Sequence, residues 1–545
     1  MVPKFFRLAA MLWLSASVGV EAGARDAPLV DAAKAGNLQA VRALLKRGAP
    51  AKVASADGTT PLHWAAYRED VELVGLLISA GADAKAANRY GATPLSLACA
   101  NGNADVIERL LKAGADANAT TAGGETALMA ASRTGRVAAV QILLARGANA
   151  NARENTRDQT ALMWAAGEGH AEIVRVLINA GAEINAKSRT PAGAPMTIGS
   201  STYRRSVPRI DVFTPFMFAV RANRIEAARV LLEAGANVNE TLPDGTSALV
   251  VAVHNAHYEM ASFLLDAGAN PNAAGQGWTA LHQLMRTRNL NIGFFPHPEP
   301  TGEVSEVELA KKLIAKGANV NARLTKPILD GYRNFWTQNG ATPLLMAAKG
   351  ADAEMMRILA AAGADATLTN TMGTTPLMAA AGVEMFNPNE DSGTNEEGLE
   401  AVKVALELGN DVNQPNKQGE TPLHGAAWRG ANAIVQLLVD RGANLLTKNK
   451  AGMTPLQIAN GEEEGRVANI NVRPWTVELM VKLMQERGLP VEMKTGQDRY
   501  AFEKTKPREG DAREVEELRR LRQQGQPPPA NKPDLGTAAP EPPPR

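Results

Sequence analysis

The sequence predicts an all-α solenoid of about twelve helix-turn-helix units, and two observations carry this prediction. Thr60, Thr93 and Thr126 recur at a spacing of 33 residues, and a fixed period of this length is typical of repeat proteins. Each period also contains two short apolar stripes at helical spacing. With 545 residues, the chain is long enough for one elongated array of such units.

The first helix of each unit follows from a few residues, as the unit at Thr93 shows. Thr93 has the side-chain oxygen that caps a helix, and Pro94 occupies the first helical position, where a missing N–H costs nothing. Leu95, Ala98 and Cys99 then give a face of mostly small side chains. We therefore expect a thin first helix.

The second helix carries a heavier apolar stripe. Val106, Ile107, Leu110 and Leu111 recur at helical spacing, and Gly114 follows where a left-handed C-cap is needed. The next residues are polar and contain Asn and Gly, which suits turns that lead into the following unit.

These residues resemble the ankyrin repeat, in which a β-turn precedes two helices and T-P-L-H-x-A opens the first helix. The stretches "TPLHWA" from Thr60 and "TPLHGA" from Thr421 match this pattern. The resemblance covers about residues 26–488 and implies β-turn fingers between repeats that contact only their neighbours. The capping positions equivalent to Thr60 are Thr93, Thr126, Thr160, Thr214, Ser247, Thr279, Thr342, Thr375, Thr421 and Thr454.

The chain is expected to have three parts. Residues 1–24 contain two cations, an apolar run shorter than a membrane span and small residues at Ala22 and Ala24, which predicts a cleaved signal peptide and a periplasmic or extracellular protein. An uncleaved membrane anchor is the alternative. Residues 25–488 form the solenoid, and residues 489–545 form a short charged helix and a Pro-rich tail.

The composition and the absence of known motifs exclude several classes of function. Lys and Arg total 58 against 57 Asp and Glu, so no overall charge draws the chain to nucleic acid or an anionic membrane. Cys99 is the single cysteine, which excludes an internal disulfide and thiolate metal clusters. The sequence also lacks a Gly-rich phosphate loop, H-E-x-x-H, G-x-S-x-G and C-x-x-C. We therefore expect no enzyme activity, no cofactor and no metal.

His63 is interpreted as structural because its position holds Ser96, Met129 and other residues in other units. The ankyrin resemblance implies that His63, His282 and His424 bond the preceding Thr and tie neighbouring repeats together. His254 and His257 have a spacing that suits a shared zinc ion, but no third ligand completes a site.

Five intervals exceed the 33-residue step and are expected to leave the stack as loops. Two of them, near 188–213 and 324–338, lengthen fingers, and three, near 289–305, 383–398 and 461–475, separate first from second helices. The long fingers contain aromatic and arginine side chains of the kind that dominate interfaces. These are Tyr203, Arg204, Arg205 and Arg209, and Tyr332, Arg333, Phe335 and Trp336. The alternative is that they fold back over their own loops.

A second set of candidate partner-binding residues follows the small residues of the first helices, where ankyrin side chains point into the binding groove. It consists of Lys34, Tyr67, Arg68, Arg133, Arg221, His254, Arg286, Lys349, Trp428 and Arg429, opposed by Glu168 and Glu462. This stripe favours a partner with an acidic surface. Ordinary solvated arginines are the alternative.

The sequence therefore predicts a non-catalytic scaffold that binds another protein through its concave groove and long fingers. Two other classes stay open. One is an enzyme with a metal or substrate site in the insertions, where His297, Glu299 and the acidic segment 389–398 occur. The other is a glycan or small-molecule binder that uses the aromatic fingers.

Overall fold

The computed structural model describes residues 28–189, 212–288, 300–328, 336–385, 393–462 and 472–493, together with the backbone of two short strands. The chain divides into two compact units, Met1–Val491 and Glu492–Arg545. Every helix and strand named below belongs to the first unit.

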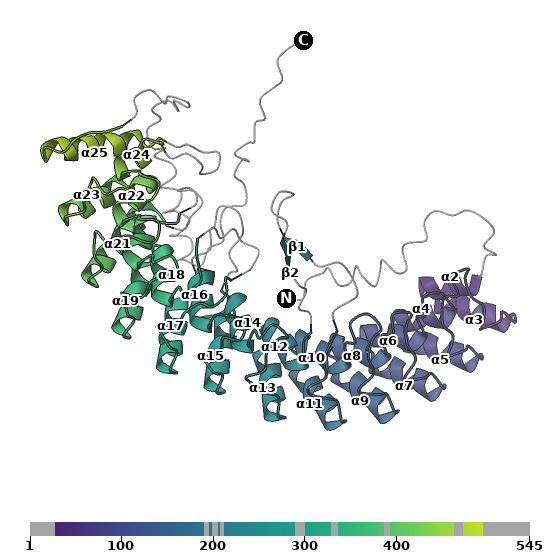
Figure 1. Ribbon diagram of the computed structural model, residues 1–545. Helices are drawn as coiled ribbons and strands as arrows, with labels where there is room; N and C mark the ends of the chain where they lie inside the picture. The colour runs from purple at the N-terminus through teal and green to yellow at the C-terminus, as the bar shows by residue number, and fades with distance from the viewer. Residues whose placement is uncertain are drawn as a thin grey trace, which may run out of the picture. The chain divides into compact units, whose positions relative to one another are not determined.

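Within this unit, twelve helix pairs of the described residues stack in chain order (Figure 1). The first helices are α2 (Pro28–Ala35), α4 (Pro61–Tyr67), α6 (Pro94–Asn101), α8 (Ala127–Thr134), α10 (Ala161–Glu168), α12 (Pro215–Arg221), α14 (Ala248–His254), α16 (Ala280–Arg288), α18 (Pro343–Lys349), α20 (Pro376–Ala381), α22 (Pro422–Arg429) and α24 (Pro455–Ala459). The second helices are α3 (Leu38–Lys46), α5 (Val71–Ser79), α7 (Ala104–Lys112), α9 (Val137–Ala145), α11 (Ala171–Asn179), α13 (Ile225–Glu233), α15 (Tyr258–Asp266), α17 (Glu306–Ala315), α19 (Ala353–Ala361), α21 (Asn395–Glu407), α23 (Asn432–Asp440) and α25 (Pro474–Glu486). The predicted all-α repeat solenoid is confirmed.

The helix ends form where the sequence places them. Thr93 Oγ1 accepts a hydrogen bond from the Ser96 backbone N–H at 3.1 Å, so the threonine caps α6. Gly114 follows α7 with a φ of 92°. Residues other than glycine rarely adopt this left-handed conformation, which explains the glycine at the end of the second helix.

Turns between the helix pairs form the fingers and bond to one another along the stack. The Arg89 N–H donates to the Asp57 carbonyl oxygen at 2.9 Å, and the Asn155 N–H donates to the Gly123 carbonyl oxygen at 2.9 Å. These bonds satisfy backbone groups of both turns.

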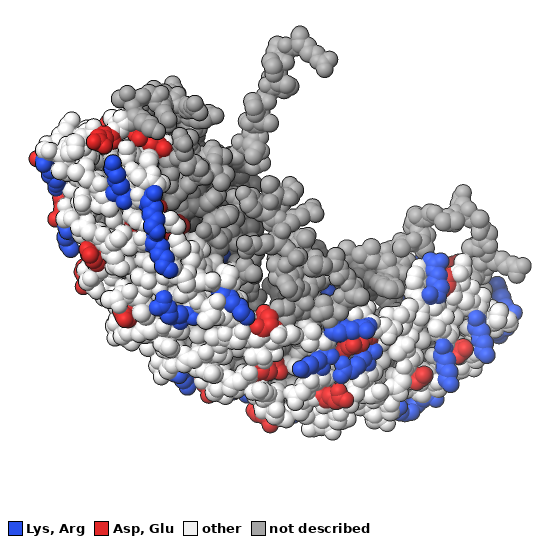
Figure 2. Space-filling model, in the orientation of Figure 1, with Lys and Arg blue, Asp and Glu red and all other residues white. Residues whose placement is uncertain are grey.

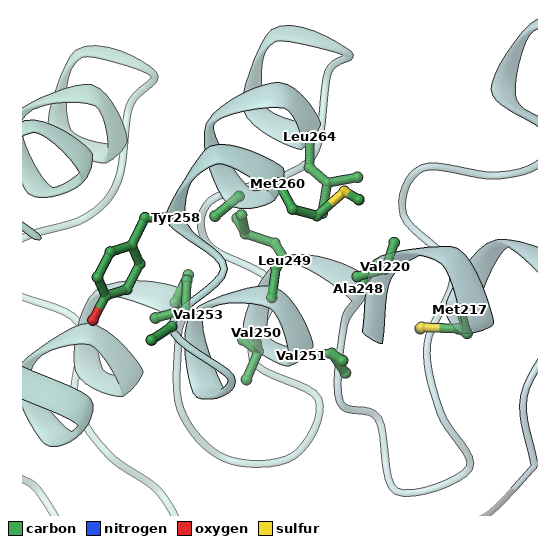
Figure 3. Close-up of a cluster of buried hydrophobic side chains, with 14 of the residues drawn as sticks. Met217, Val220, Ala248, Leu249, Val250, Val251, Val253, Tyr258, Met260 and Leu264 are labelled. Atoms are coloured by element: carbon green, nitrogen blue, oxygen red, sulfur yellow. The ribbon is translucent and has the colours of Figure 1, made fainter. Parts of the chain in front are cut away.

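The core consists of small residues on first helices and larger ones on second helices. Ala66 of α4 is fully buried, and so is Leu110 of α7. In the middle of the array, Val220 and Val253 replace this small residue and are also fully buried. Figure 3 shows the resulting cluster of buried hydrophobic side chains from α12, α14 and α15.

The long intervals fall between particular helices. Interval 188–213 separates α11 from α12 and contains an antiparallel hairpin of β1 (Met196–Ile198) and β2 (Arg205–Val207), in which Met196 pairs with Val207. Interval 324–338 separates α17 from α18, whereas the other three separate first from second helices. None of the helices in the described ranges has the length and apolarity needed to cross a membrane.

Candidate partner-binding surface

His63 is a link between repeats and not a functional base. Its Nδ1 accepts from the Thr60 backbone N–H at 3.1 Å, and its Nε2 lies 2.9 Å from the Ala92 carbonyl oxygen of the next repeat. A carbonyl oxygen only accepts, so Nε2 carries the proton and donates, and the ring is neutral. Burial lowers the pKa of His63, which favours this neutral form.

His282 and His424 make the same link, as the ankyrin resemblance implied. Their Nε2 atoms donate to the Ala341 and Met453 carbonyl oxygens, each at 3.2 Å. Burial lowers the pKa of His282 to about 4. A methionine at this position, such as Met129, has no N–H to donate to the next repeat.

His257 and His254 also bond within the array. His257 Nε2 donates to the Arg221 carbonyl oxygen at 3.1 Å, and His254 Nδ1 lies 3.3 Å from Gln283 Nε2. Across the described residues, no group of three or more His, Cys, Asp or Glu side chains is placed to hold a metal ion. Within these residues, therefore, no third side chain is placed to complete a zinc site with His254 and His257.

We define the first-helix surface as the side of the stack formed by partly exposed residues of the first helices. Over α2 and α4, Lys34 Nζ lies 5.2 Å from the Trp64 ring centroid. The Trp64 and Tyr67 rings meet edge to face at 6.1 Å. The Arg68 guanidinium donates to the Lys34 carbonyl oxygen at 3.2 Å, so one of its N–H groups is occupied by a hydrogen bond within the chain.

Arg133 of α8 lies over an aromatic ring of the next repeat. Its guanidinium carbon is 4.7 Å from the Trp164 ring centroid, an arrangement that stabilises the cation through the ring quadrupole. Arg133 Nη2 is also 3.5 Å from Glu125 Oε1. Burial raises the pKa of Glu125, although Arg133 opposes that shift.

The aromatic surface continues from α10 to α12. Phe218 lies beside Gly167, the residue one helical turn after Trp164. The Phe218 and Phe213 ring centroids are 5.6 Å apart, and the Arg221 guanidinium lies 5.2 Å from the Phe213 ring. We call the partly exposed Trp164 and Phe218 the aromatic strip, and Arg133 and Arg221 flank it. Phe213 is only 7% exposed and belongs to the core, where it supports Arg221.

The same helical positions are buried in later repeats. The residues equivalent to Trp64 and Trp164 in α14, α16, α18 and α20 are Val251, Gln283, Met346 and Ala379, whose exposed fractions are 8%, 2%, 6% and 2%. Among the described residues, partly exposed aromatic side chains at this helical position are those of α4, α10 and α12, namely Trp64, Trp164 and Phe218.

Arg429 differs from its expected role. Only 6% of this residue is exposed. Its guanidinium donates to the Gly393 and Thr394 carbonyl oxygens at 3.0 and 2.6 Å and to Asn395 Oδ1 at 3.0 Å. The residues that lead into α21 fold against the end of α22, so Arg429 holds this junction together and we remove it from the candidate surface.

The remaining candidates in the later repeats are half-buried. Trp428 packs against the core, and Lys349 Nζ donates to the Val383 carbonyl oxygen at 3.3 Å. Arg286 lies at the end of α16, where it is partly exposed. None of the three extends the aromatic strip.

Charge over the array is mixed. Figure 2 shows Lys and Arg interspersed with Asp and Glu on the face in view, without a broad patch of one sign. This agrees with the formal net charge of +1. Any electrostatic effect of this surface is therefore local, as around Arg133 and Arg221.

Comparison with known proteins identifies the repeat. A family described as "Ankyrin repeats (3 copies)" matches residues 29–121, 114–188, 216–293 and 303–387, and one described as "Ankyrin repeats (many copies)" matches residues 406–459. The chain belongs to the ankyrin-repeat family. The family assignment predicted from the T-P-L-H motif is thus confirmed.

Several proteins with different names are similar to parts of this ankyrin chain. It is 35% identical over 254 residues to human Ankyrin repeat and SOCS box protein 16, which covers 46% of this chain and 48% of the relative. It is 28% identical over 266 residues to Arabidopsis thaliana E3 ubiquitin-protein ligase KEG, covering 45% and 16%. It is 38% identical over 61 residues to mouse Protein phosphatase 1 regulatory subunit 12A, covering 11% and 6%. The chain thus spans less than half the length of each relative.

The long-finger candidates lie largely outside the described residues. This applies to Tyr203, Arg204 and Arg209 in one finger and to Tyr332, Arg333 and Phe335 in the other. Arg205 belongs to strand β2. Trp336 is half-buried and packs against the core, which favours the fold-back interpretation for this one side chain.

Sequence reasoning missed an asparagine ladder along the ankyrin fingers. Asn151 Nδ2 donates to the Gly181 carbonyl oxygen at 2.9 Å, and its Oδ1 accepts from the Glu183 N–H at 2.7 Å. The same paired bonds occur at Asn118, Asn239, Asn272, Asn321 and Asn413. The recurring "GANANA" and "GANVNA" stretches are the sequence feature that marks it.

Proposed function

We propose that this ankyrin array is a non-catalytic scaffold that binds another protein through the first-helix surface of α2–α12 and the long fingers. The single observation that carries the proposal is the partly exposed series of aromatic and cationic side chains on that surface. Trp, Tyr and Arg most often dominate protein interfaces. Ankyrin repeats generally mediate protein–protein interaction, and one relative is named a regulatory subunit.

The catalytic alternative has less support. His297 and Glu299, which the enzyme hypothesis needs, lie outside the described residues. The relatives named as ligases share only part of their length with this chain. The repeated fold itself is typically a binding scaffold.

We also propose that the chain is exported. The charged, apolar and small-residue segments of residues 1–24 support this. Mass spectrometry of the protein purified from its native cells is expected to find an N-terminus near Gly23 or Arg25. A mature protein that retains Met1 and its apolar run would contradict export by cleavage.

Site-specific photo-crosslinking tests the binding surface. Burial raises the pKa of the Cys99 thiol, so a new surface cysteine is labelled selectively. Ala100→Cys places a crosslinker on α6 at the position equivalent to Tyr67, whereas Gln141→Cys places it on the exposed side of α9. We expect a distinct protein adduct from position 100 and none from position 141. Identical adducts from both positions would remove the first-helix surface from the proposal.

A further inference from the structure

We propose that the aromatic strip and its flanking arginines bind an extended acidic peptide segment. Two carboxylates of this segment pair with Arg133 and Arg221, and the apolar side chains between them cover the aromatic strip. This inference names the chemistry of the partner, and it rests on the proposed function.

The flanking arginines are held ready for carboxylates. The Arg133 guanidinium carbon lies over the Trp164 ring at 4.7 Å and that of Arg221 over the Phe213 ring at 5.2 Å, and the attraction between cation and ring restrains both side chains. The N–H groups of a guanidinium form a planar fork that matches a carboxylate. Because the side chains are already ordered, binding loses less rotamer entropy than it would with free arginines.

The two ends of the strip differ in an informative way. At one end, Glu125 supplies an internal carboxylate 3.5 Å from Arg133, longer than a good charged hydrogen bond. A peptide carboxylate that approaches more closely would displace it. At the other end, Arg221 is exposed and forms no ion pair with a carboxylate in the described part of the chain.

The centre of the strip is unsuited to a third carboxylate. Glu168 is an exposed acid at the end of α10, between the two arginines. Like charges repel, whereas the rings of Trp164 and Phe218 favour apolar contact. The expected ligand therefore has acids at its ends and apolar residues between them.

The distance between the Arg133 and Arg221 guanidinium groups sets the length of the ligand. Arg133 belongs to α8 but rests on α10, and Arg221 belongs to α12, so one to two helix layers, roughly 10–20 Å, separate the guanidinium groups. An extended chain advances about 3.3 Å per residue. About three to six residues separate the two acids.

Titration of the intact protein with a synthetic peptide tests this design. In the peptide, two glutamates flank Leu-Pro-Leu and both ends are blocked; a second peptide has glutamine in both places. We expect Arg133→Gln and Arg221→Gln each to weaken binding of the glutamate peptide about tenfold, because each removes one ion pair, and the glutamine peptide, which lacks both, to bind about a hundredfold more weakly. Glu125→Gln is expected to strengthen binding about threefold or more, because it removes the internal competitor.

Arg229 of α13 provides a matched control. It stacks on Phe263 at 4.8 Å, but on the second-helix side of the array. Arg229→Gln is expected to leave peptide binding unchanged. Equal binding of both peptides, an equal loss in Arg229→Gln, or no gain in Glu125→Gln would overturn the inference. Equal binding of a DNA oligonucleotide would do the same, because it would indicate general anion attraction.

The crosslinking experiment separates this inference from the proposed function. If Ala100→Cys still yields a specific protein adduct while the glutamate peptide fails to bind, the surface binds a protein of different chemistry. In that case the scaffold proposal stands and the acidic-peptide inference falls.

Discussion

The first helices of α2–α12 and of α14–α24 share one repeat pattern but present different surfaces. In the earlier part, Trp64 and Trp164 are partly exposed and stacked with cations. In the later part, the equivalent Val251 and Ala379 are buried. The repeat thus determines where a side chain lies on its helix, whereas its exposure depends on the residues that other segments place around it.

The same difference separates two arginines that look alike in the sequence. Arg133 and Arg429 both follow the small residues of a first helix. Arg133 retains partial exposure over an aromatic ring, whereas Arg429 is enclosed by backbone carbonyls. Arg133 is therefore accessible to solvent, whereas Arg429 stabilises the fold.

The largest expected effect comes from replacing these arginines in turn. Arg429→Ala removes the guanidinium that donates to the Gly393 and Thr394 carbonyl oxygens and to Asn395 Oδ1, and hydrogen bonds to charged groups contribute about 1.5–3 kcal/mol each. We expect a loss of about 3 kcal/mol or more in the free energy of unfolding, measured by urea denaturation. Arg133→Ala is expected to cost below about 1 kcal/mol. Similar losses in both variants would contradict the distinction between the two parts.

A tryptophan substituted at equivalent positions probes the space above each first helix. Leu97 of α6 is half-buried, whereas Ala379 of α20 is 2% exposed. Ala379→Trp overfills a packed site and is expected to cost about 2–3 kcal/mol. Leu97→Trp is expected to cost below about 1 kcal/mol, because the ring can lie along the open surface. Thermal unfolding followed by circular dichroism measures both, and equal shifts would refute the contrast.

The buried His282 predicts a pH effect in the later part of the array. Its folded-state pKa is about 4, below the ordinary value of 6.5. Above pH 6.5 both folded and unfolded states hold a neutral ring, so this group adds no pH dependence. As the pH falls below 6.5 the unfolded state takes up the proton first, and stability is lost until the pH reaches about 4. The expected loss at pH 5 is about 2 kcal/mol.

The variant His282→Met isolates this effect. Methionine occupies the same position in other repeats, for example at Met163 and Met378. Urea denaturation at pH 7 and pH 5 is expected to show a smaller pH-dependent loss in the variant than in the parent chain. An unchanged difference between the two pH values would assign the acid sensitivity to other groups.

The sequence predicted those contacts that the repeat itself determines. The bonds of His63 follow from the T-P-L-H spacing and from the identical geometry of the next repeat. The contact of Arg133 with Trp164 has a comparable origin, because the two positions recur in adjacent units, although only Arg133 was identified as a candidate from the sequence.

Contacts made by insertions were beyond sequence reasoning. Arg429 bonds to Gly393 and Asn395, which belong to an interval of irregular length whose path no periodicity specifies. The polar surroundings of such an arginine arise from backbone carbonyls, which carry no residue-specific pattern. The solvent exposure of Arg429, which is 6%, was therefore overestimated from the sequence.

The smallest expected difference comes from the asparagine ladder, which is alike in both parts. Asn151 and Asn321 are both half-buried, and each bonds the next repeat through its Nδ2 and its Oδ1, the latter at 2.7 Å in both cases. Asn151→Ala and Asn321→Ala are each expected to cost about 1 kcal/mol, because two partly solvated hydrogen bonds are lost.

Equal costs in these two variants would locate the difference between the two parts at the first-helix surface. The finger side would then be a uniform scaffold whose neighbour-to-neighbour bonds are insensitive to position. Urea denaturation of Asn151→Ala and Asn321→Ala measures this directly. A markedly larger loss in Asn321→Ala would instead show that the later repeats are coupled more tightly throughout, and the burial of Val251 and Ala379 would be one consequence of that coupling.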